Sequence, residues 1–551
     1  MPSNQSPVSR ILNLLKLEKN EITAVYFYAI LNGLIQLSLP VGVQAIIGYV
    51  LGASMRASLV VLIILVVLGV FIAGIMQVNQ MKIIEKIQQK MFVRYSFAFT
   101  QHIPNLDLKK NDTIYLPELV NRFFDVPVLQ KGLSKILLEI PTAVIQILFG
   151  LILLCFYHPA FVLFGIILIT LLIIILRFTG GKGLQTSLEK SKYKYKVAAW
   201  LEEMARILLS VKLGKNNNLH LQKADDEVSN YLDARNNHFK VLLFQFNVLV
   251  IFKTIITAAM LIVGTLLMVK QQLTVGQFIA AEIVILLVLN SVEKLIINLS
   301  SVYDTLTAVE KLSEITDKPT EQSGSVLLPA TGKGLKLEMK DVSFSYNGEK
   351  NILNNISLEI KPNEKVCITG KDSSGKSTLL KLMTGAYTDF KGAILLDDIP
   401  VSNYDLDSLR AQTGVVLNQQ DIFQGTVWEN ISLGNKLVSL ETVKEISAKT
   451  GLTDFIATQK KGYDTLLDPT GKRLPRNVVH RILLVRALAA NPRLLLLEEP
   501  WINFHENHRK QIMQLLTSLQ NTTVVVVSND DEFIKKCTKR IVIDENGSVK
   551  N

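Results

Sequence analysis

The sequence predicts a multi-domain membrane protein in which an all-α half precedes an α/β half. The chain has 551 residues, 49% of them hydrophobic, and its mean hydropathy of +0.30 is high for a soluble protein of this length. Six apolar stretches of membrane-spanning length lie within residues 22–296. A glycine-rich loop at residues 370–378 follows an apolar strand pattern and opens a helix pattern, as in an α/β nucleotide-binding fold.

The six apolar stretches predict a six-helix transmembrane domain. An apolar helix of about 20 residues crosses a bilayer. The alternative for any single stretch is a buried helix of a large soluble core, and six such stretches in one half of the chain disfavour it. The predicted spans are Ile22–Leu51, Leu59–Val78, Ile136–Tyr157, Ala160–Leu176, Val248–Val269 and Val275–Ile296.

Basic residues between the spans predict the topology. Residues 81–134 hold eight Lys and Arg and residues 177–240 hold twelve, whereas no short connector holds more than one. The positive-inside rule therefore places both long segments and the N-terminus in the cytoplasm. The net charge of +11 is then a consequence of topology, with membrane lipid and not nucleic acid as the partner. Binding of anionic lipid as the main function is a weaker alternative.

Both long segments are helical in pattern and break only near their midpoints. The breaks lie at residues 104–107 and 214–218, which contain Pro, Asn and Gly. Helices rise about 1.5 Å per residue, so these turns lie far from the bilayer. We expect both turns to contact a cytoplasmic domain.

Polar side chains within the spans have two interpretations. Buried charge is costly in lipid, so such residues either line a cavity or pair with each other near the interface. Amide side chains likewise fit a polar path or helix packing equally well. The ionisable residues are Glu139, Lys253, Glu282 and Glu293, and the amides are Asn32, Gln36 and Gln44.

Residues 1–21 form a polar cytoplasmic segment without the pattern of a secretory signal. The transmembrane domain follows at residues 22–316, a linker rich in Pro and Gly at 317–336, and the nucleotide-binding domain at 337–551. Cys155, Cys367 and Cys537 are far apart in sequence, which predicts neither a disulfide nor a metal site.

The loop at residues 370–378 has the composition of a phosphate-binding loop. Gly370 and Gly375 let the backbone turn its amide groups towards a phosphate, Lys376 supplies positive charge, and the Ser377 hydroxyl is a ligand for Mg²⁺. The anion lies at a helix N-terminus, where the dipole is favourable. The sequence therefore predicts ATP and Mg²⁺ as cofactors. The remaining binding candidates in the loop are Ser373, Ser374 and Thr378.

Two carboxylates follow an apolar strand at residues 494–497. Glu498 is the candidate that orients the metal, and Glu499 is the candidate that polarises the attacking water.

With these motifs the chain resembles a half-transporter of the ATP-binding cassette (ABC) exporter class over nearly its full length. The resemblance implies a type I exporter-like transmembrane domain and a P-loop NTPase domain. It also places Tyr346 against adenine and Asn418 at the glutamine of the Q-loop, although Gln419 fits that position after a one-residue slip. Residues 39–44 and the loops after them are most similar to bacterial type I secretion exporters. These transporters export peptides or proteins across the cytoplasmic (inner) membrane, with their nucleotide-binding domains in the cytoplasm. The resemblance further implies a homodimer or a heterodimer, a periplasmic adaptor and an outer-membrane channel.

Several family motifs are altered. Glu498 replaces the metal-site aspartate, His505 the D-loop aspartate, and Asn529 the switch histidine. The glycine-rich signature sequence of the family is also replaced. The replacement contains a proline, which has no N–H to offer, and larger side chains, which crowd the close approach to the γ-phosphate that glycine permits. Binding is expected to survive, while catalysis through Glu499, Asn529 and Asn418 is expected to be slow. The segment that replaces the signature sequence is Leu474, Pro475, Arg476, Asn477 and Val478.

Two functions remain open from the sequence. The first is an ATP-binding exporter subunit, active slowly as a homodimer or beside a partner with an intact signature. The second is a nucleotide-gated membrane scaffold without hydrolysis, or the regulatory half of a heterodimer. Retention of Glu499 favours the transporter, because a pure sensor does not need a carboxylate that activates water.

Overall fold

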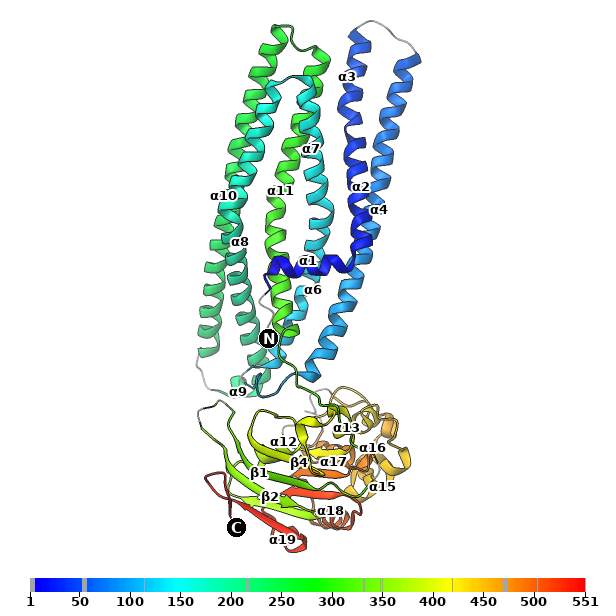
Figure 1. Ribbon diagram of the computed structural model, residues 1–551, viewed down its shortest axis with the longest axis vertical. Helices are drawn as coiled ribbons and strands as arrows, with labels where there is room; N and C mark the ends of the chain where they lie inside the picture. Colours follow the sequence, from blue (N-terminus) through cyan, green and yellow to red (C-terminus); the bar gives the residue numbers. More distant parts are fainter. Residues whose placement is uncertain are drawn as a thin grey trace. The chain divides into compact units, whose positions relative to one another are not determined.

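The computed structural model describes residues 5–51, 57–112, 114–214, 218–330, 332–346, 348, 350–418, 420–468, 474–502 and 504–550. The chain divides into two compact units (Figure 1). The first comprises Met1–Asn105 and Ile114–Lys318, and the second comprises Leu106–Thr113 and Pro319–Asn551. The predicted transmembrane domain, residues 22–316, differs from this division because it includes residues 106–113.

The described residues of the first unit are mainly helical, and they include six helical segments long and apolar enough to span a membrane, which confirms the predicted number. A short π-helix at Lys135–Glu139 leads into α7. The helices are α1 (Pro7–Leu17), α2 (Lys19–Gln36), α3 (Ser38–Leu51), α4 (Ala57–His102), α5 (Leu116–Val120), α6 (Val126–Ser134), α7 (Ile140–Tyr157), α8 (Ala160–Arg206), α9 (Leu208–Leu213), α10 (Leu219–Val269) and α11 (Val275–Thr316).

The long helices extend well beyond the predicted spans. α8 has 47 residues and α10 has 51, and the two run side by side (Figure 1). α11 begins with a capping box in which Thr274 and Gln277 bond each other's backbone N–H groups. Phe156 and Phe178 are 82% and 76% exposed on the unit's apolar surface, as expected for side chains that face lipid.

Two local features were not predicted from the sequence. The first span is not one helix, because α2 ends at Gln36 and α3 restarts at Ser38; Pro40 lies in the first turn of α3, where its missing N–H costs no hydrogen bond. The polar segment at residues 1–21 is largely helical, and α1 lies across the long helices of its unit (Figure 1).

The second unit contains two sheets. An antiparallel sheet has the order β2-β1-β4-β5, and a six-stranded sheet has the order β10-β9-β3-β8-β7-β6. In the larger sheet the five strands from β9 to β6 are parallel, and β10 is antiparallel to β9. The strands are β1 (Leu337–Phe344), β2 (Leu353–Ile360), β3 (Lys365–Gly370), β4 (Lys391–Leu396), β5 (Ile399–Pro400), β6 (Thr413–Val416), β7 (Leu494–Glu498), β8 (Thr523–Val527), β9 (Lys539–Ile543) and β10 (Val549–Lys550).

The helices of this unit lie between its strands in the chain and connect them. Parallel strands require such crossovers. They are α12 (Lys376–Met383), α13 (Leu406–Ala411), α14 (Val427–Ser432), α15 (Leu440–Thr450), α16 (Leu452–Thr458), α17 (Arg476–Ala489), α18 (Glu506–Ser518) and α19 (Asp531–Lys536).

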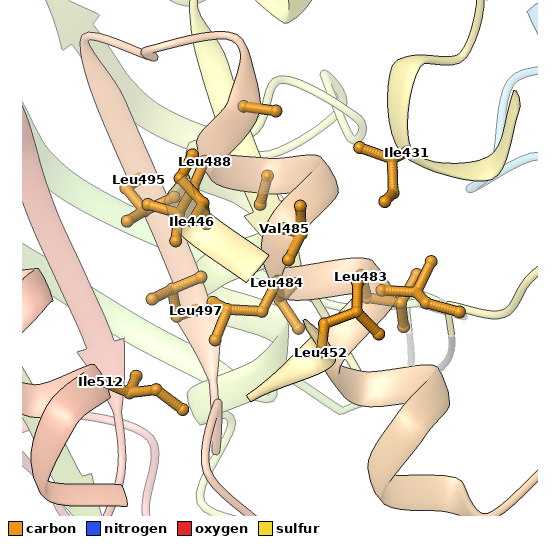
Figure 2. Close-up of a cluster of buried hydrophobic side chains, with 14 of the residues drawn as sticks. Ile431, Ile446, Leu452, Leu483, Leu484, Val485, Leu488, Leu495, Leu497 and Ile512 are labelled. Carbon is orange, nitrogen blue, oxygen red and sulfur yellow. The ribbon is translucent and has the colours of Figure 1, made fainter. Parts of the chain in front are cut away.

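α17 and β7 share a continuous apolar core, shown in Figure 2. Leu484 of α17 and Leu497 of β7 are fully buried in this cluster, together with Leu452 from α16. The core fixes the strand that ends in the two carboxylates and therefore determines where the site lies.

The segment after α4 belongs to the second unit, whereas the sequence analysis placed it in the transmembrane domain and expected its turn only to contact a cytoplasmic domain. Leu106 forms an antiparallel bridge with Thr320, and the Asp107 N–H donates to the Pro319 carbonyl at 3.0 Å. The other predicted turn lies largely outside the described residues, since residues 215–217 are not among them.

Candidate nucleotide site

The phosphate-binding loop lies between β3 and α12, as the sequence predicts. Gly375 has φ +93° and Gly370 has φ +158°. A Cβ on Gly375 would lie 2.7 Å from a Leu353 methyl group, so this position requires glycine. Ser373 adopts φ +64°, a left-handed conformation that costs a non-glycine residue roughly 1–3 kcal/mol. Ser373 thus keeps the backbone shape at a position where the family has glycine.

The Lys376 side chain turns back towards the start of the phosphate-binding loop. Its ammonium group donates to the carbonyls of Gly370, at 2.8 Å, and Lys371, at 2.6 Å. These contacts hold the cation at the centre of the curved backbone, where successive N–H groups favour an anion.

Ser377 and Glu498 form the candidate metal site. The Ser377 hydroxyl donates to the Glu498 carboxylate, and the Asn418 N–H donates to its other oxygen at 3.0 Å. Glu498 is buried. A hydroxyl and a carboxylate are the few oxygen ligands that Mg²⁺ takes from a protein when phosphates supply the rest.

Glu499 lies one residue beyond the strand and turns back towards it. Its backbone has φ +41°, its N–H donates to the Val527 carbonyl at 3.0 Å, and its carboxylate accepts a hydrogen bond from the Ser528 hydroxyl at 2.9 Å. Burial raises the pKa of the Glu499 carboxyl, while the hydrogen bond from Ser528 opposes this change. The position and the raised pKa are those of a candidate general base.

Asn529 contacts the start of the phosphate-binding loop. Its carbonyl accepts the Gly370 N–H and its NH₂ donates to the Gly370 carbonyl, both at 3.2 Å. The residue in the switch position is therefore attached directly to the first glycine of the phosphate-binding loop.

These groups surround one cleft of about 360 Å³, which is a typical size for a small-molecule site. Tyr346 lies outside this lining, and its hydroxyl is 3.2 Å from the Thr378 hydroxyl at the edge of the loop. Gln419 is outside the described residues. The cleft is lined by Ile352, Asp372, Ser373, Gly375, Lys376, Ser377, Thr378, Asn418, Glu498, Glu499, Val527 and Asn529.

The signature-equivalent residues lie elsewhere in this chain. Pro475 is the N-cap of α17, and none of residues 474–478 lines the cleft. The Arg476 side chain is 70% exposed, and its guanidinium lies 3.7 Å from the Asp421 carboxylate. His505 is the N-cap of α18. The structure brings together the loop, Glu498, Glu499, Asn418 and Asn529, but not the signature segment.

The sequence analysis did not identify Ser528. Ser528 follows β8 directly and precedes Asn529, so its place at a strand end was an available signal. Ser374 was a candidate for binding, but the structure places it inward: it is 2% exposed, and its hydroxyl has no hydrogen-bond partner among the described residues.

The membrane-spanning unit contains a separate polar cavity of about 380 Å³. A chain of hydrogen bonds crosses its wall: Ser291 donates to Gln146 at 2.8 Å, Gln146 to Gln36, and Gln36 to Asn32 at 3.2 Å. Of the two interpretations given above, lining a cavity applies to some of the polar residues and pairing with each other applies to others. Glu139 lines the cavity and accepts a 2.7 Å hydrogen bond from Asn298, whereas Lys253 pairs with Glu293 at 2.9 Å. The lining residues are Asn32, Gln36, Gln77, Leu138, Glu139, Thr142, Ala143, Gln146 and Lys294.

Known proteins match both halves of the chain. The ABC transporter transmembrane region matches residues 22–292, and the ABC transporter domain matches residues 353–502. The alpha-hemolysin translocation ATP-binding protein of Escherichia coli O157:H7 is 32% identical over 284 residues, which are 51% of this chain and 40% of that protein. The leukotoxin translocation ATP-binding protein of Mannheimia haemolytica is 31% identical over 289 residues, which are 52% of this chain and 40% of that protein. The match thus spans about 40% of the length of these relatives.

The fold has a solved counterpart. The structure of a bacterial Atm1-family ABC exporter with ATP bound superposes with a TM-score of 0.82 at 18% identity, over 97% of this chain and 96% of that one. This likeness confirms the predicted exporter fold. The two family matches, which together cover most of the sequence, identify the chain as a member of the ABC transporter family.

Proposed function

We propose that this chain is the membrane-spanning and ATP-binding subunit of an exporter that moves cargo across the bacterial cytoplasmic membrane, with its nucleotide-binding domain in the cytoplasm. The observation that carries the proposal is the cleft in which Lys376, Ser377, Glu498 and Glu499 meet, on a chain whose described residues include six candidate spans. The subunit works as a dimer, because in this family each composite site takes its signature from the second subunit.

Each residue of the cleft has a role in this proposal. Lys376 and the loop amides bind the β- and γ-phosphates, and Tyr346 stacks on the adenine. Ser377 and Glu498 would hold Mg²⁺, which would neutralise charge on the phosphate oxygens. Glu499 accepts a proton from the attacking water, and Ser528 keeps its carboxylate in place through the 2.9 Å hydrogen bond.

The altered motifs are expected to slow ATP hydrolysis and to leave ATP binding intact. Pro475 has no N–H to offer, and Asn529 is committed to Gly370 by two hydrogen bonds. Loss of one preorganised polar group typically costs about 10²–10³ in rate. We therefore expect normal ATP binding and slow hydrolysis in a homodimer, and faster hydrolysis beside a partner with an intact signature.

The cargo is a peptide or protein in this proposal. The relatives named above are translocation proteins for a hemolysin and a leukotoxin. The cavity offers amide donors and acceptors, the Glu139 carboxylate and the Lys294 ammonium, which match the peptide backbone and its charged groups. A periplasmic adaptor and an outer-membrane channel are the expected partners.

A second candidate is a nucleotide-gated membrane scaffold that binds ATP without hydrolysis. The two hydrogen bonds between Asn529 and Gly370 favour it, because they attach the residue in the switch position to the phosphate-binding loop. The position of Glu499 at the cleft favours the exporter.

The deciding experiment is ATP hydrolysis and ATP binding by the purified chain in lipid nanodiscs. Turnover that is lost in both Glu499→Gln and Lys376→Ala supports the exporter. Binding that requires Lys376, without any turnover alone or beside a partner subunit, supports the scaffold. Absence of ATP binding contradicts both.

Cargo contact has its own test. A photo-reactive residue at Gln77, which lines the cavity, is expected to cross-link a translocating polypeptide. The same residue at Phe156, which is 82% exposed, is the control. Equal cross-linking at both positions contradicts a role for the cavity.

A further inference from the structure

One side chain from the turn after α4 reaches the aromatic residues beside the nucleotide site. The Lys109 ammonium donates to the Asp389 main-chain carbonyl at 2.7 Å and to the Asp389 carboxylate at 2.9 Å. The same ammonium lies 5.1 Å from the centre of the Phe344 ring. Both partners belong to the second unit, as does Lys109 itself. Lys109 thus joins the end of β1 to the loop that follows α12.

Three aromatic rings pack behind this contact. Phe344 and Tyr346 meet edge to face with centroids 4.9 Å apart, and Tyr387 lies 5.5 Å from Phe344 and 5.7 Å from Tyr346. Phe344 and Tyr387 are 2% and 5% exposed. Pairs of this geometry favour one relative orientation, so the position of Tyr346 depends on both of its neighbours. Asp389 is only two residues beyond Tyr387, so Lys109 contacts the loop that begins at Tyr387.

The hydroxyl end of Tyr346 lies next to α12, the helix that follows the phosphate-binding loop. Its hydroxyl is 3.2 Å from the hydroxyl of Thr378, two residues beyond Lys376 on α12. A continuous set of contacts therefore runs from Lys109 through Phe344 to Tyr346 and ends at the edge of the cleft. Lys109 itself does not line the cleft.

We propose that Lys109 is a positioning residue for base recognition: it fixes Phe344 and the loop at Asp389, and these hold Tyr346 in the orientation that receives the nucleotide base. This inference rests on the proposed role of Tyr346. It assigns to the turn after α4 a contribution to affinity for the base, separate from the affinity for the phosphates that Lys376 supplies.

The chain offers a matched control next to Lys109. Lys110 is on the same turn, its side chain is 54% exposed, and its ammonium pairs with Asp107 at 3.2 Å. Lys109→Met keeps the aliphatic stem and removes the charge, and Lys109→Arg keeps the charge, the donors and the contact with the ring.

The test measures dissociation constants of Mg·ATP and Mg·tripolyphosphate for the full chain in nanodiscs. Tripolyphosphate has no base, so it reports only on the phosphate site. We expect Lys109→Met to weaken Mg·ATP binding about three- to tenfold, which lies within the range of one cation–π contact, and to leave tripolyphosphate binding unchanged. Lys109→Arg restores ATP affinity, and Lys110→Met is neutral.

Two results overturn the inference: unchanged ATP affinity in Lys109→Met, or an equal loss of affinity for both ligands, which would mark a merely structural role. A double-mutant cycle adds a second readout, because residues that act through one another are not additive. Lys109→Met is expected to have little further effect in a Tyr346→Leu background, and full additivity contradicts the proposal. Wild-type ATP binding that Lys376→Ala abolishes establishes the nucleotide site independently of these outcomes.

Discussion

The side-chain amide of Asn529 pairs with both backbone groups of Gly370, with each hydrogen bond 3.2 Å long. The pairing arises because β8, which leads to Asn529, lies directly beside β3, which ends at Gly370. A neutral histidine ring also has one donor and one acceptor, but its two ring nitrogens point in different directions and cannot pair with the N–H and C=O of one residue as an amide does. The altered switch residue therefore supports the phosphate-binding loop at a position where a ligand to the γ-phosphate is expected.

Asn529→His is expected to increase ATP hydrolysis, because it exchanges the contact with the loop for a side chain able to reach the transferring phosphate. We expect an increase of about tenfold or more, given the usual effect of one preorganised group. Steady-state phosphate release measures it. Asn529→Ala is the control, since it removes the contact with Gly370 without adding a ring. Equal rates in the two variants would show that loop release, and not the histidine, is responsible.

Glu499→Gln is expected to stabilise the chain near neutral pH while it abolishes turnover. Burial raises the pKa of Glu499, so the folded state binds this proton more tightly than the unfolded state does. The ionised carboxylate then destabilises the fold once the pH exceeds the unfolded pKa, and the penalty is complete above the folded pKa. Glutamine removes this penalty.

Thermal unfolding at several pH values measures this effect. The melting temperature of Glu499→Gln should exceed that of the wild type above the raised pKa and approach it in acid, below the unfolded pKa. Lys376→Ala serves as a second inactive variant that keeps the carboxylate. A stability difference that is independent of pH would contradict the assignment.

Much of the fold and site was predictable because the signals are local. Apolar runs indicate spans wherever they occur, and Gly370, Lys376 and Ser377 lie within one loop. The contacts between Glu499 and Ser528 and between Asn529 and Gly370 were not predictable, because they depend on the strand order β3-β8-β7. The break between α2 and α3 and the position of Lys109 against Phe344 depend on packing between distant segments, which periodicity does not report.

Arg476→Ala is expected to reduce ATP-dependent closure of the dimer, on the hypothesis that this guanidinium replaces the signature as a ligand of the γ-phosphate on the opposite subunit. Its side chain is 70% exposed and 3.7 Å from Asp421, a weak surface pair that leaves it available to a stronger anion. Distance measurements between spin labels on the two nucleotide-binding domains report closure. Arg206→Ala, which removes an exposed arginine paired with Glu203, is the control. Unchanged closure in Arg476→Ala would remove the hypothesis.

Leu484→Ala is expected to destabilise the second unit by about 2–5 kcal/mol, the usual cost of emptying a buried leucine site. Leu484 is fully buried in the core of Figure 2, between α16 and β7, and this core fixes the strand that carries Glu498. We therefore expect a lower melting temperature together with weaker Mg·ATP binding, because the metal ligand loses its support. Leu437→Ala is the matched control, since Leu437 is 80% exposed and its truncation empties no cavity. A stable Leu484→Ala protein with normal nucleotide affinity would mean that the position of Glu498 does not depend on this core.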